Sequence, residues 1–351
     1  MSWIERTRNG LRYVDRIKID GQYKKLSTPI EKDTPQARRT ARERLLEKAD
    51  RIEHPAQYRT VKELLDDYLA RPGIRESTRK SNMIIYTALD SIISEPVSRI
   101  DAAAIRQAIV STGKKIKTMN RYIRRTKNFL RWCYAMGYLD EDLSARLIKF
   151  PEAETVRDPS DLYLEIPELR CLIDGLSGMH RYAVQFLSLT GCRVGEMSAL
   201  LMSDLEGDYI NVFKSYSVTT KEVTIPKTAS SVRRIYIQPE LREVLDEFLR
   251  WRKLYMMSKG IRTDLLFFSR NGNVLDECLL WNAMQKVGKK YHPHILRHTH
   301  TALLADQGMT LDAIARRLGH SDSNITKEVY YHVTEKQRKK DEQAMAEVRI
   351  L

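Results

Sequence analysis

Residues 294–299 read His-Ile-Leu-Arg-His-Thr, and this stretch does more than any other to decide the fold of the C-terminal half. It lies in a region that reads as helix, so His294 and Arg297, three positions apart, share one helical face. Imidazole and guanidinium groups both donate hydrogen bonds to phosphate oxygens. The stretch therefore predicts a helix that presents a phosphate-binding pair.

Three more segments, on either side of this stretch, carry residues of related chemistry. Residues 190–196 read Thr-Gly-Cys-Arg-Val-Gly-Glu, and residues 226–228 read Pro-Lys-Thr. Residues 318–320 read Leu-Gly-His, and the triplet Tyr330-Tyr331-His332 begins ten residues after that histidine. Each segment alone would be a weak signal, but their order and separations together are hard to explain by chance.

In combination, the four segments resemble the tyrosine recombinase (phage integrase) family over about residues 165–335. The chain is most similar to the three-domain integrases of temperate phages and of integrative or conjugative elements. The resemblance implies an active enzyme that cuts DNA through a 3′-phosphotyrosine intermediate, frees a 5′ hydroxyl, and needs neither a cofactor nor a metal. It assigns six catalytic residues, with the tyrosine as nucleophile: Arg193, Lys227, His294, Arg297, His320 and Tyr330.

These side-chain types suit the transfer of a phosphodiester, which requires a nucleophile, a charge clamp and an acid for the leaving group. Arg193 and Arg297 can grip the non-bridging oxygens in a fork geometry that lysine does not reproduce. A phenol ordinarily has a pKa of about 10, so Tyr330 needs an acceptor for its proton, and His294 is the expected one. Lys227 is the expected acid for the departing 5′ oxygen.

Tyr331 competes with Tyr330 as the nucleophile, and the family spacing Tyr-x-His selects Tyr330 because a histidine stands two residues after it. Glu196, one turn after Arg193, is expected to fix that arginine rather than to act chemically. His320 is expected to donate a hydrogen bond to the phosphate.

The histidines at positions 292, 294, 298 and 300 also allow a zinc site, because closely spaced imidazoles are good metal ligands. Phosphate transfer through a tyrosine requires no metal, so we predict none. The cysteines at positions 133, 171, 192 and 278 lie far apart without a Cys-x-x-Cys pair. They are expected to be buried thiols rather than disulfide partners or zinc ligands.

The first 55 residues read as a small basic module. Apolar and polar residues alternate around Asp20-Gly21, which predicts a small hairpin sheet within residues 3–26. A helix is expected to begin at Pro35 and to end before His54-Pro55. Up to Ile52 this stretch holds 14 basic and 8 acidic residues, which favours an arm-type DNA-binding module over a merely solvated surface.

From Thr60 to about Ile148 apolar residues repeat at steps of three and four, which is typical of an all-helical domain. Within it, residues 114–131 carry eight lysines or arginines and no acid. On a helix from Thr118 these cations lie mainly opposite an apolar stripe, and such a surface repels itself unless phosphates neutralise it. DNA contact is favoured over a soluble face, and the predicted DNA-binding residues are Lys114, Lys115, Lys117, Arg121, Arg124, Arg125 and Arg131.

Residues 150–162 lose periodicity and read as a linker. The domain that follows is predicted to begin with three helices, to continue through short strands near residues 209–214, 222–226 and 233–238, and to end in helices. The expected fold class is multidomain and mainly α with small β-sheets. Its parts are an N-terminal sheet-and-helix module (1–55), a helical, SAM-like core-binding domain (58–150), a mixed α+β catalytic domain (160–335) and a C-terminal tail (336–351).

Composition agrees with this organisation. The 351 residues are 42% hydrophobic and 30% charged, an ordinary globular balance. Sixty Lys and Arg against 46 Asp and Glu leave a net charge of +14, which favours a polyanionic partner. No apolar run is long enough for a membrane helix and the first residues lack the apolar region of a signal peptide, so we predict a cytoplasmic, nucleoid-associated protein of a bacterial host.

The predicted function is a site-specific recombinase that integrates and excises a prophage or mobile element. The resemblance implies a homotetramer on double-stranded DNA with core and arm sites, strand exchange through a Holliday junction, and an excisionase and a host DNA-bending protein as candidate partners. Alternatives are a chromosome-dimer-resolving recombinase, a type IB topoisomerase-like enzyme, or a DNA-binding regulator without catalysis. The segment 334–351, a polar helix with an apolar end, is expected to dock on a neighbouring protomer or, alternatively, on its own domain.

Overall fold

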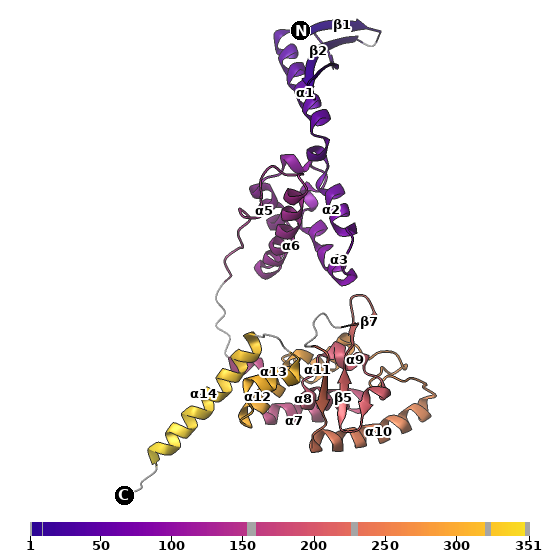
Figure 1. Cartoon of the computed structure of the whole chain (residues 1–351), viewed down its shortest axis with the longest axis vertical. Helices are drawn as coiled ribbons and strands as arrows, with labels where there is room; N and C mark the ends of the chain where they lie inside the picture. The colour runs from indigo at the N-terminus through magenta and orange to yellow at the C-terminus, as the bar shows by residue number, and fades with distance from the viewer. Residues whose placement is uncertain (1, 9, 153–158, 226–230, 320–323, 348–351) are drawn as a thin grey trace. The chain divides into compact units, whose positions relative to one another are not determined.

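The computed structural model describes residues 2–8, 10–152, 159–225, 231–319 and 324–347. The chain divides into two compact units, residues 1–154 and residues 155–351 (Figure 1). Among the described residues, no helix combines the length and the apolar character needed to cross a membrane.

Unit 1 begins with a three-stranded antiparallel sheet of β1 (Ser2–Thr7), β2 (Gly10–Ile19) and β3 (Gln22–Ile30), with β2 in the middle. Asp20 and Gly21 join β2 to β3 with φ values of 51° and 80°, and two successive positive φ angles make the turn typical of tight hairpins. The predicted hairpin is confirmed, and β1 adds a third strand to it.

Helix α1 (Pro35–Glu53) packs against this sheet. The Thr34 hydroxyl caps its first turn by accepting a hydrogen bond from the Ala37 amide, and the helix ends at Glu53, just before His54-Pro55 as predicted. Apolar side chains from both elements form one small core: Tyr13, Ile19, Leu26, Ala41, Leu45 and Ala49.

The rest of unit 1 is all-helical, as predicted. Its elements are η1 (Pro55–Tyr58), α2 (Val61–Ala70), α3 (Glu76–Asn82), α4 (Ile84–Ala88), η2 (Asp90–Ile92), η3 (Val97–Arg99), α5 (Ala102–Ser111) and α6 (Ile116–Ala135). Helix α6 is central to the core, where Phe129 meets the ring of Tyr68 from α2 edge-on at a centroid distance of 5.5 Å.

Unit 2 contains the remaining helices. They are η4 (Pro159–Leu162), α7 (Ile166–Asp174), α8 (Gly178–Thr190), α9 (Val194–Ala199), η5 (Met202–Asp204), α10 (Pro239–Lys259), α11 (Glu277–Val287), α12 (Pro293–Asp306), α13 (Leu311–Leu318) and α14 (Asn324–Glu347). The three helices expected at the start of this domain correspond to α7, α8 and α9.

The strands of unit 2 form two small antiparallel sheets. One contains β4 (Leu205–Glu206), β5 (Tyr209–Val212) and β8 (Arg233–Tyr236), and the other is a hairpin of β6 (Ser215–Ser217) and β7 (Glu222–Thr224). The single strand predicted over 209–214 is therefore wrong in its last two residues, because β5 ends at Val212. The chain leaves the sheet after Val212, where Lys214 turns inward and its Nζ pairs with Asp204 Oδ2 at 2.7 Å.

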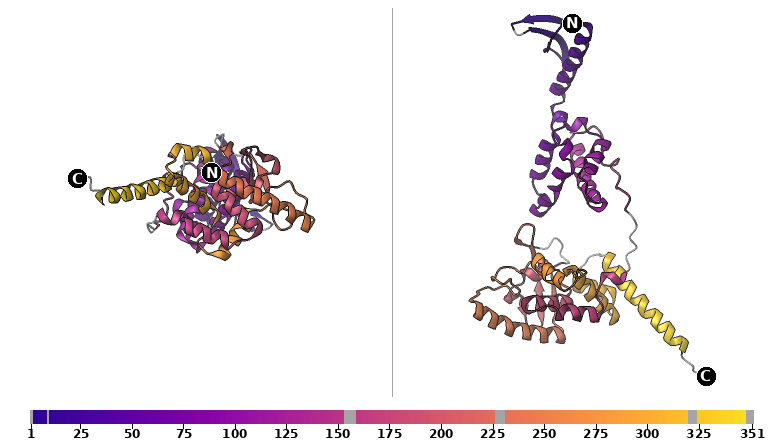
Figure 2. Two further views of the ribbon diagram at one scale, coloured as in Figure 1. Left: turned by 90° about the horizontal axis from the view of Figure 1, so that it is seen from below. Right: turned by 180° about the vertical axis from the view of Figure 1, so that it is seen from behind.

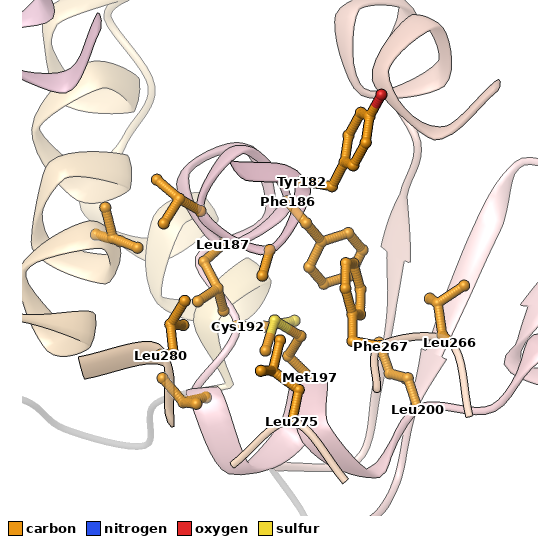
Figure 3. Close-up of a cluster of buried hydrophobic side chains, with 14 of the residues drawn as sticks. Tyr182, Phe186, Leu187, Cys192, Met197, Leu200, Leu266, Phe267, Leu275 and Leu280 are labelled. Atoms are coloured by element: carbon orange, nitrogen blue, oxygen red, sulfur yellow. The ribbon is translucent and has the colours of Figure 1, made fainter. Parts of the chain in front are cut away.

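The core of unit 2 is built around α8 (Figure 3). Phe186 of α8 packs against Phe267 with ring centroids 4.9 Å apart, and the buried side chains of Cys192 and Met197 join the same cluster. Because Cys192 and Met197 lie on either side of Arg193 in sequence, the core fixes the backbone on both sides of that arginine.

A second cluster joins α12, α13 and the first part of α14, and it contains Leu318, Val329 and Val333. Beyond Val333, α14 continues as an unbroken helix past the boundary expected at residue 336 and projects away from the rest of unit 2 (Figure 2). Lys336 Nζ pairs with Glu165 Oε1 at 2.8 Å. Of the apolar tail residues, Ala346 is exposed, and residues 348–351 lie outside the described residues.

All four cysteines were predicted to be buried, and this is wrong for two of them. Cys133 and Cys192 are buried, but Cys171 and Cys278 are exposed. Cys171 falls on the solvent face of α7, and Cys278 is the second residue of α11, where the helix has just begun.

Candidate active site

Arg193 stands at the junction between α8 and α9. The chain turns there at Gly191, whose φ of +66° lies in the left-handed region that favours glycine. A Cβ at Gly191 would lie 2.5 Å from Leu318 Cδ2 and 2.6 Å from His300 Cδ2. The turn therefore requires glycine both for its conformation and for the close approach of two other segments. Arg193 follows with 36% of its side chain exposed.

Glu196 is the anion beside Arg193, and its side chain is 3% exposed. Glu196 Oε1 accepts hydrogen bonds from Arg193 Nη1 at 2.9 Å and from Arg233 Nη1 at 3.2 Å. Oε2 accepts from the Arg193 backbone amide and from Arg233 Nη2, both at 2.9 Å. Burial alone would raise the pKa of Glu196, but the hydrogen bond and charge of Arg233 outweigh it and hold that pKa below its ordinary value. The carboxylate is therefore ionised at neutral pH.

Arg297 lies on α12 and is 4% exposed. Its Nη1 donates to the Gly191 carbonyl at 2.6 Å, and its Nη2 donates to the Leu318 carbonyl at 2.7 Å. Burial, followed by the positive charges of Arg193 and Arg233, lowers the pKa of Arg297 to about 9, so the guanidinium remains protonated at neutral pH.

These two hydrogen bonds bring three of the four motif segments together. Gly191 lies two residues before Arg193, and Leu318 lies two residues before His320. Gly319 ends α13 with a φ of +69°, which turns the chain immediately after Leu318. His320 and Lys227 themselves lie outside the described residues.

The histidines near Arg297 have different surroundings. His294 is exposed in the first turn of α12, on the same helix as Arg297 and three residues before it. His298, one turn later, is half-buried, and burial together with the neighbouring His294 and Arg297 lowers its pKa to about 4. Of His294 and His298, His294 is therefore the one that solvent or a substrate can reach directly.

His300 is buried and structural. Its Nδ1 donates to the Ser188 carbonyl at 2.8 Å, since a carbonyl can only accept, and its Nε2 accepts from Arg317 Nε at 3.1 Å. Burial, with the charge of Arg317, lowers the pKa of His300 to about 3. Within the described part of the chain, no three His, Cys, Asp or Glu side chains are grouped so that they could hold a metal ion.

Tyr330 and Tyr331 differ in their packing on α14. Tyr330 is half-buried and packs against the cluster that contains Leu318, whose carbonyl binds Arg297. Tyr331 is 59% exposed, and the two rings meet edge to face with centroids 5.7 Å apart. Tyr330 thus lies on the side of α14 that packs toward α12 and α13.

In unit 1, the basic side chains of α6 and of the residues just before it lie largely in solvent. The exposed members of the predicted set are Lys114, Lys115, Lys117, Arg121, Arg124 and Arg131. Arg125 differs, because it is half-buried and its Nη1 donates to Asn82 Oδ1 at 3.2 Å. The helix is amphipathic as predicted, with Tyr122 and Phe129 among the side chains on its buried face.

Two arginines point into unit 2, and this was not predicted from the sequence for either of them. Arg233 at the start of β8 binds Glu196, and Arg317 near the end of α13 binds His300 Nε2, the Leu189 carbonyl and Gln238 Oε1. Each belongs to an Arg-Arg pair, and alternation in a strand or rotation along a helix turns only one member inward. The pairs were a visible signal, but nothing local distinguishes the inward member.

The chain is similar in sequence to known integrases. Residues 165–337 match the model of the phage integrase family. The prophage ps2 probable integrase of Lactococcus lactis subsp. lactis (strain IL1403) is 28% identical over 95% of this chain and 96% of its own length. This chain belongs to the phage integrase family of tyrosine recombinases.

Two solved structures of integrases share the fold. The Tn1549 transposon integrase in complex with transposon right-end DNA superposes with a TM-score of 0.63 at 19% identity, over 80% of this chain and 99% of that chain. A lambda integrase tetramer bound to a Holliday junction gives a TM-score of 0.58 at 18% identity, over 93% of this chain and 94% of that chain. The predicted multidomain, mainly helical fold class is confirmed.

Proposed function

We propose that this integrase-family protein is a site-specific DNA recombinase that integrates and excises a prophage or a related mobile element. The observation that carries the proposal is the pair of hydrogen bonds from Arg297 to the carbonyls of Gly191 and Leu318. They join Gly191, Arg297 and Leu318, each of which belongs to a different motif segment, within unit 2. The similarity to a prophage integrase over nearly the whole of both chains favours this role over chromosome-dimer resolution.

In this proposal Arg193 and Arg297 are the charge clamp. The half-exposed Arg193 guanidinium can reach a non-bridging phosphate oxygen, and the buried Arg297 adds a second positive charge at a fixed place. Three arginines and one carboxylate, Glu196, leave a net positive charge before any phosphate arrives. A preformed positive site stabilises the extra negative charge of the pentacoordinate transition state without having to reorganise.

The covalent step is assigned to Tyr330. Its phenolic oxygen attacks the scissile phosphorus, the bond from phosphorus to the 5′ oxygen breaks, and a 3′-phosphotyrosine link forms. His294 takes the phenolic proton, Lys227 gives a proton to the departing 5′ oxygen, and His320 donates a hydrogen bond to the phosphate. Attack by a 5′ hydroxyl from a second duplex reverses these transfers and rejoins the strands.

The remaining parts bind DNA. The exposed cations of residues 114–131 contact the backbone of the core site, and the basic sheet-and-helix module (1–55) contacts separate arm sites. We propose a tetramer on DNA, by analogy with the lambda integrase tetramer bound to a Holliday junction. An excisionase and a host DNA-bending protein are proposed as partners in choosing direction, and the bacterial nucleoid as the place of action.

Covalent capture tests the proposal. The full-length protein is incubated with a core-site duplex from the ends of its own element, nicked so that the fragment released by cleavage diffuses away. We expect a denaturant-resistant protein–DNA complex from the wild type and from Tyr331→Phe, and none from Tyr330→Phe, whose duplex binding should be unchanged. If the wild type forms no such complex the recombinase assignment is wrong, and if only Tyr331→Phe loses it the nucleophile is misassigned.

A further inference from the structure

We propose that Arg233 is a positioning residue of this site, which occupies the Glu196 carboxylate and thereby keeps Arg193 available to the scissile phosphate. This inference rests on the proposed function, because it assigns Arg193 to the charge clamp. Its test is arranged so that the two can fail separately.

The first observation is that Arg233 directs every nitrogen of its guanidinium inward. Nη1 and Nη2 form a two-pronged pair with the two oxygens of Glu196, at 3.2 Å and 2.9 Å. Nε donates to the Arg317 carbonyl at 2.8 Å, and Nη1 also contacts the Ser231 carbonyl at 3.2 Å. With its side chain 6% exposed, Arg233 is anchored on both sides and has no nitrogen left for a substrate.

The second observation is that Glu196 has few hydrogen-bond acceptor positions left for the side chain of Arg193. A carboxylate offers about four acceptor positions, and Arg233 takes two of them while the Arg193 backbone amide takes a third. The Arg193 side chain reaches the carboxylate through Nη1 alone, at 2.9 Å. Within the described residues, its Nε and Nη2 make no other hydrogen bond, so this part of the fork can engage a phosphate.

Removal of Arg233 would change this balance. Glu196 would keep its charge in a buried place and would lose its two-pronged partner, and the nearest remaining guanidinium is Arg193. A fork-to-fork pair is the strongest arrangement open to these two groups, because a buried carboxylate without a partner is costly. Arg193 would then close on Glu196 with both prongs, and its charge and its donors would be withdrawn from the phosphate.

Arg233 also adds positive charge to the site, so its effect on charge must be separated from its effect on geometry. Arg233→Lys retains the charge but offers a single point of contact instead of a fork. Arg233→Met removes both. Arg252→Met is the matched control, because Arg252 is also a buried arginine (7% exposed) that donates to backbone carbonyls of unit 2, including Leu265 O at 2.6 Å, but does not touch Glu196.

The experiment is a double-mutant cycle in the full chain. Single-turnover formation of the covalent complex and duplex binding are measured for wild type, Arg233→Met, Glu196→Gln and the double variant. Withdrawal of one preorganised donor typically slows a reaction by about 100-fold, and we expect that loss in Arg233→Met with duplex binding retained. In the Glu196→Gln background, where no carboxylate can capture Arg193, the same substitution should cost no more than about threefold. Arg233→Lys should remain at least about tenfold slow, whereas Arg252→Met should cleave normally.

A second readout uses DNA with a methylphosphonate at the scissile position, in which a methyl group replaces one charged oxygen. Because there is little charge to clamp, the rate ratio of wild type to Arg233→Met should shrink at least about tenfold. A variant that is slow only because it is misfolded would show the same ratio on both substrates, and the double variant still tests the idea if Arg233→Met does not fold.

Four results would overturn the inference: normal cleavage by Arg233→Met, normal cleavage by Arg233→Lys, an equal cost of Arg233→Met in both backgrounds, or an unchanged ratio on the methylphosphonate. In each of these cases a covalent complex from the wild type would leave the recombinase assignment intact. If the wild type forms no complex, the proposed function itself has failed.

Discussion

Replacement of Gly191 by alanine tests the close approach of segments on which the site depends. A left-handed φ costs an alanine about 1–2 kcal/mol, and Gly191 has a φ of +66°. The added Cβ would also stand 2.5 Å from Leu318 Cδ2 and 2.6 Å from His300 Cδ2, and overpacking of this kind typically costs about 1–3 kcal/mol. We expect Gly191→Ala to lower the free energy of unfolding of unit 2 by roughly 2–5 kcal/mol.

Gly260→Ala is the matched control. Gly260 ends α10 with a φ of +62°, and nothing lies within 4 Å of the position its Cβ would take. Only the backbone cost of about 1–2 kcal/mol applies there. In a domain of 150–250 residues each kcal/mol lowers Tm by about 2–4 °C, so we expect losses of roughly 4–20 °C for Gly191→Ala and roughly 2–8 °C for Gly260→Ala.

Because the two units of the chain need not unfold together, the assay must assign the loss to one of them. Hydrogen exchange followed by mass spectrometry does so, since peptides from α8 and α12 report on unit 2 and peptides from α6 report on unit 1. Gly191→Ala should speed exchange in α8 and α12 alone, and it should slow covalent capture because the Gly191 carbonyl binds Arg297. Equal losses of stability in the two variants would refute the close approach.

The remaining predictions concern other parts of the chain. Charge reversal at Arg121 and Arg124 should weaken duplex binding across sequences and reduce the slope of log K against log salt concentration by about two units. An unchanged slope in a salt titration would mean that α6 only presents a solvated face to water. Deletion of residues 1–55 should spare cleavage of a core site but impair complete recombination in a two-duplex assay, and full recombination by the truncated protein would contradict the arm-binding role. Folding lowers the pKa of His300 to about 3, so the folded state binds fewer protons than the unfolded state below pH 6.5. Its stabilisation is therefore complete above pH 6.5 and is lost as pH falls toward 3, and His300→Gln should flatten that part of a stability–pH curve measured with urea. Removal of residues 340–351 should keep folding and DNA binding but disrupt the tetramer on a full site, and normal assembly by light scattering would favour docking within one protomer.

The parts of this molecule that could be predicted from sequence are those with a local cause. Asp20-Gly21 specifies its hairpin through two positive φ angles, and Thr34-Pro35 marks the start of α1 through a cap and a fixed φ. The amphipathic pattern of α6 likewise located its buried face. The motif segments could be brought together only through the resemblance to a family, because no local rule places Gly191 beside Leu318.

The features that escaped prediction depend on partners distant in sequence. Arg233 and Arg234 are neighbours with the same side chain. Arg233 turns inward because Glu196 and the Arg317 carbonyl accept its hydrogen bonds there. The end of β5 at Val212 depends similarly on Asp204, whose carboxylate receives Lys214. A polar side chain becomes buried only when tertiary structure supplies its partners, so such positions leave no periodic signal.

The two arginines of the proposed clamp are held by different kinds of partner, which affects how much positive charge the site keeps. Arg297 is fixed by two backbone carbonyls, which orient the guanidinium without neutralising it. Arg193 is fixed by the carboxylate of Glu196, which would cancel its charge if the pair were exclusive. Because Glu196 is shared with Arg233, two arginines divide one negative charge and the cluster stays positive. The free energy needed to gather cations in a buried site is thus supplied on folding, so under the proposed function a phosphate would meet positive charge that is already in place.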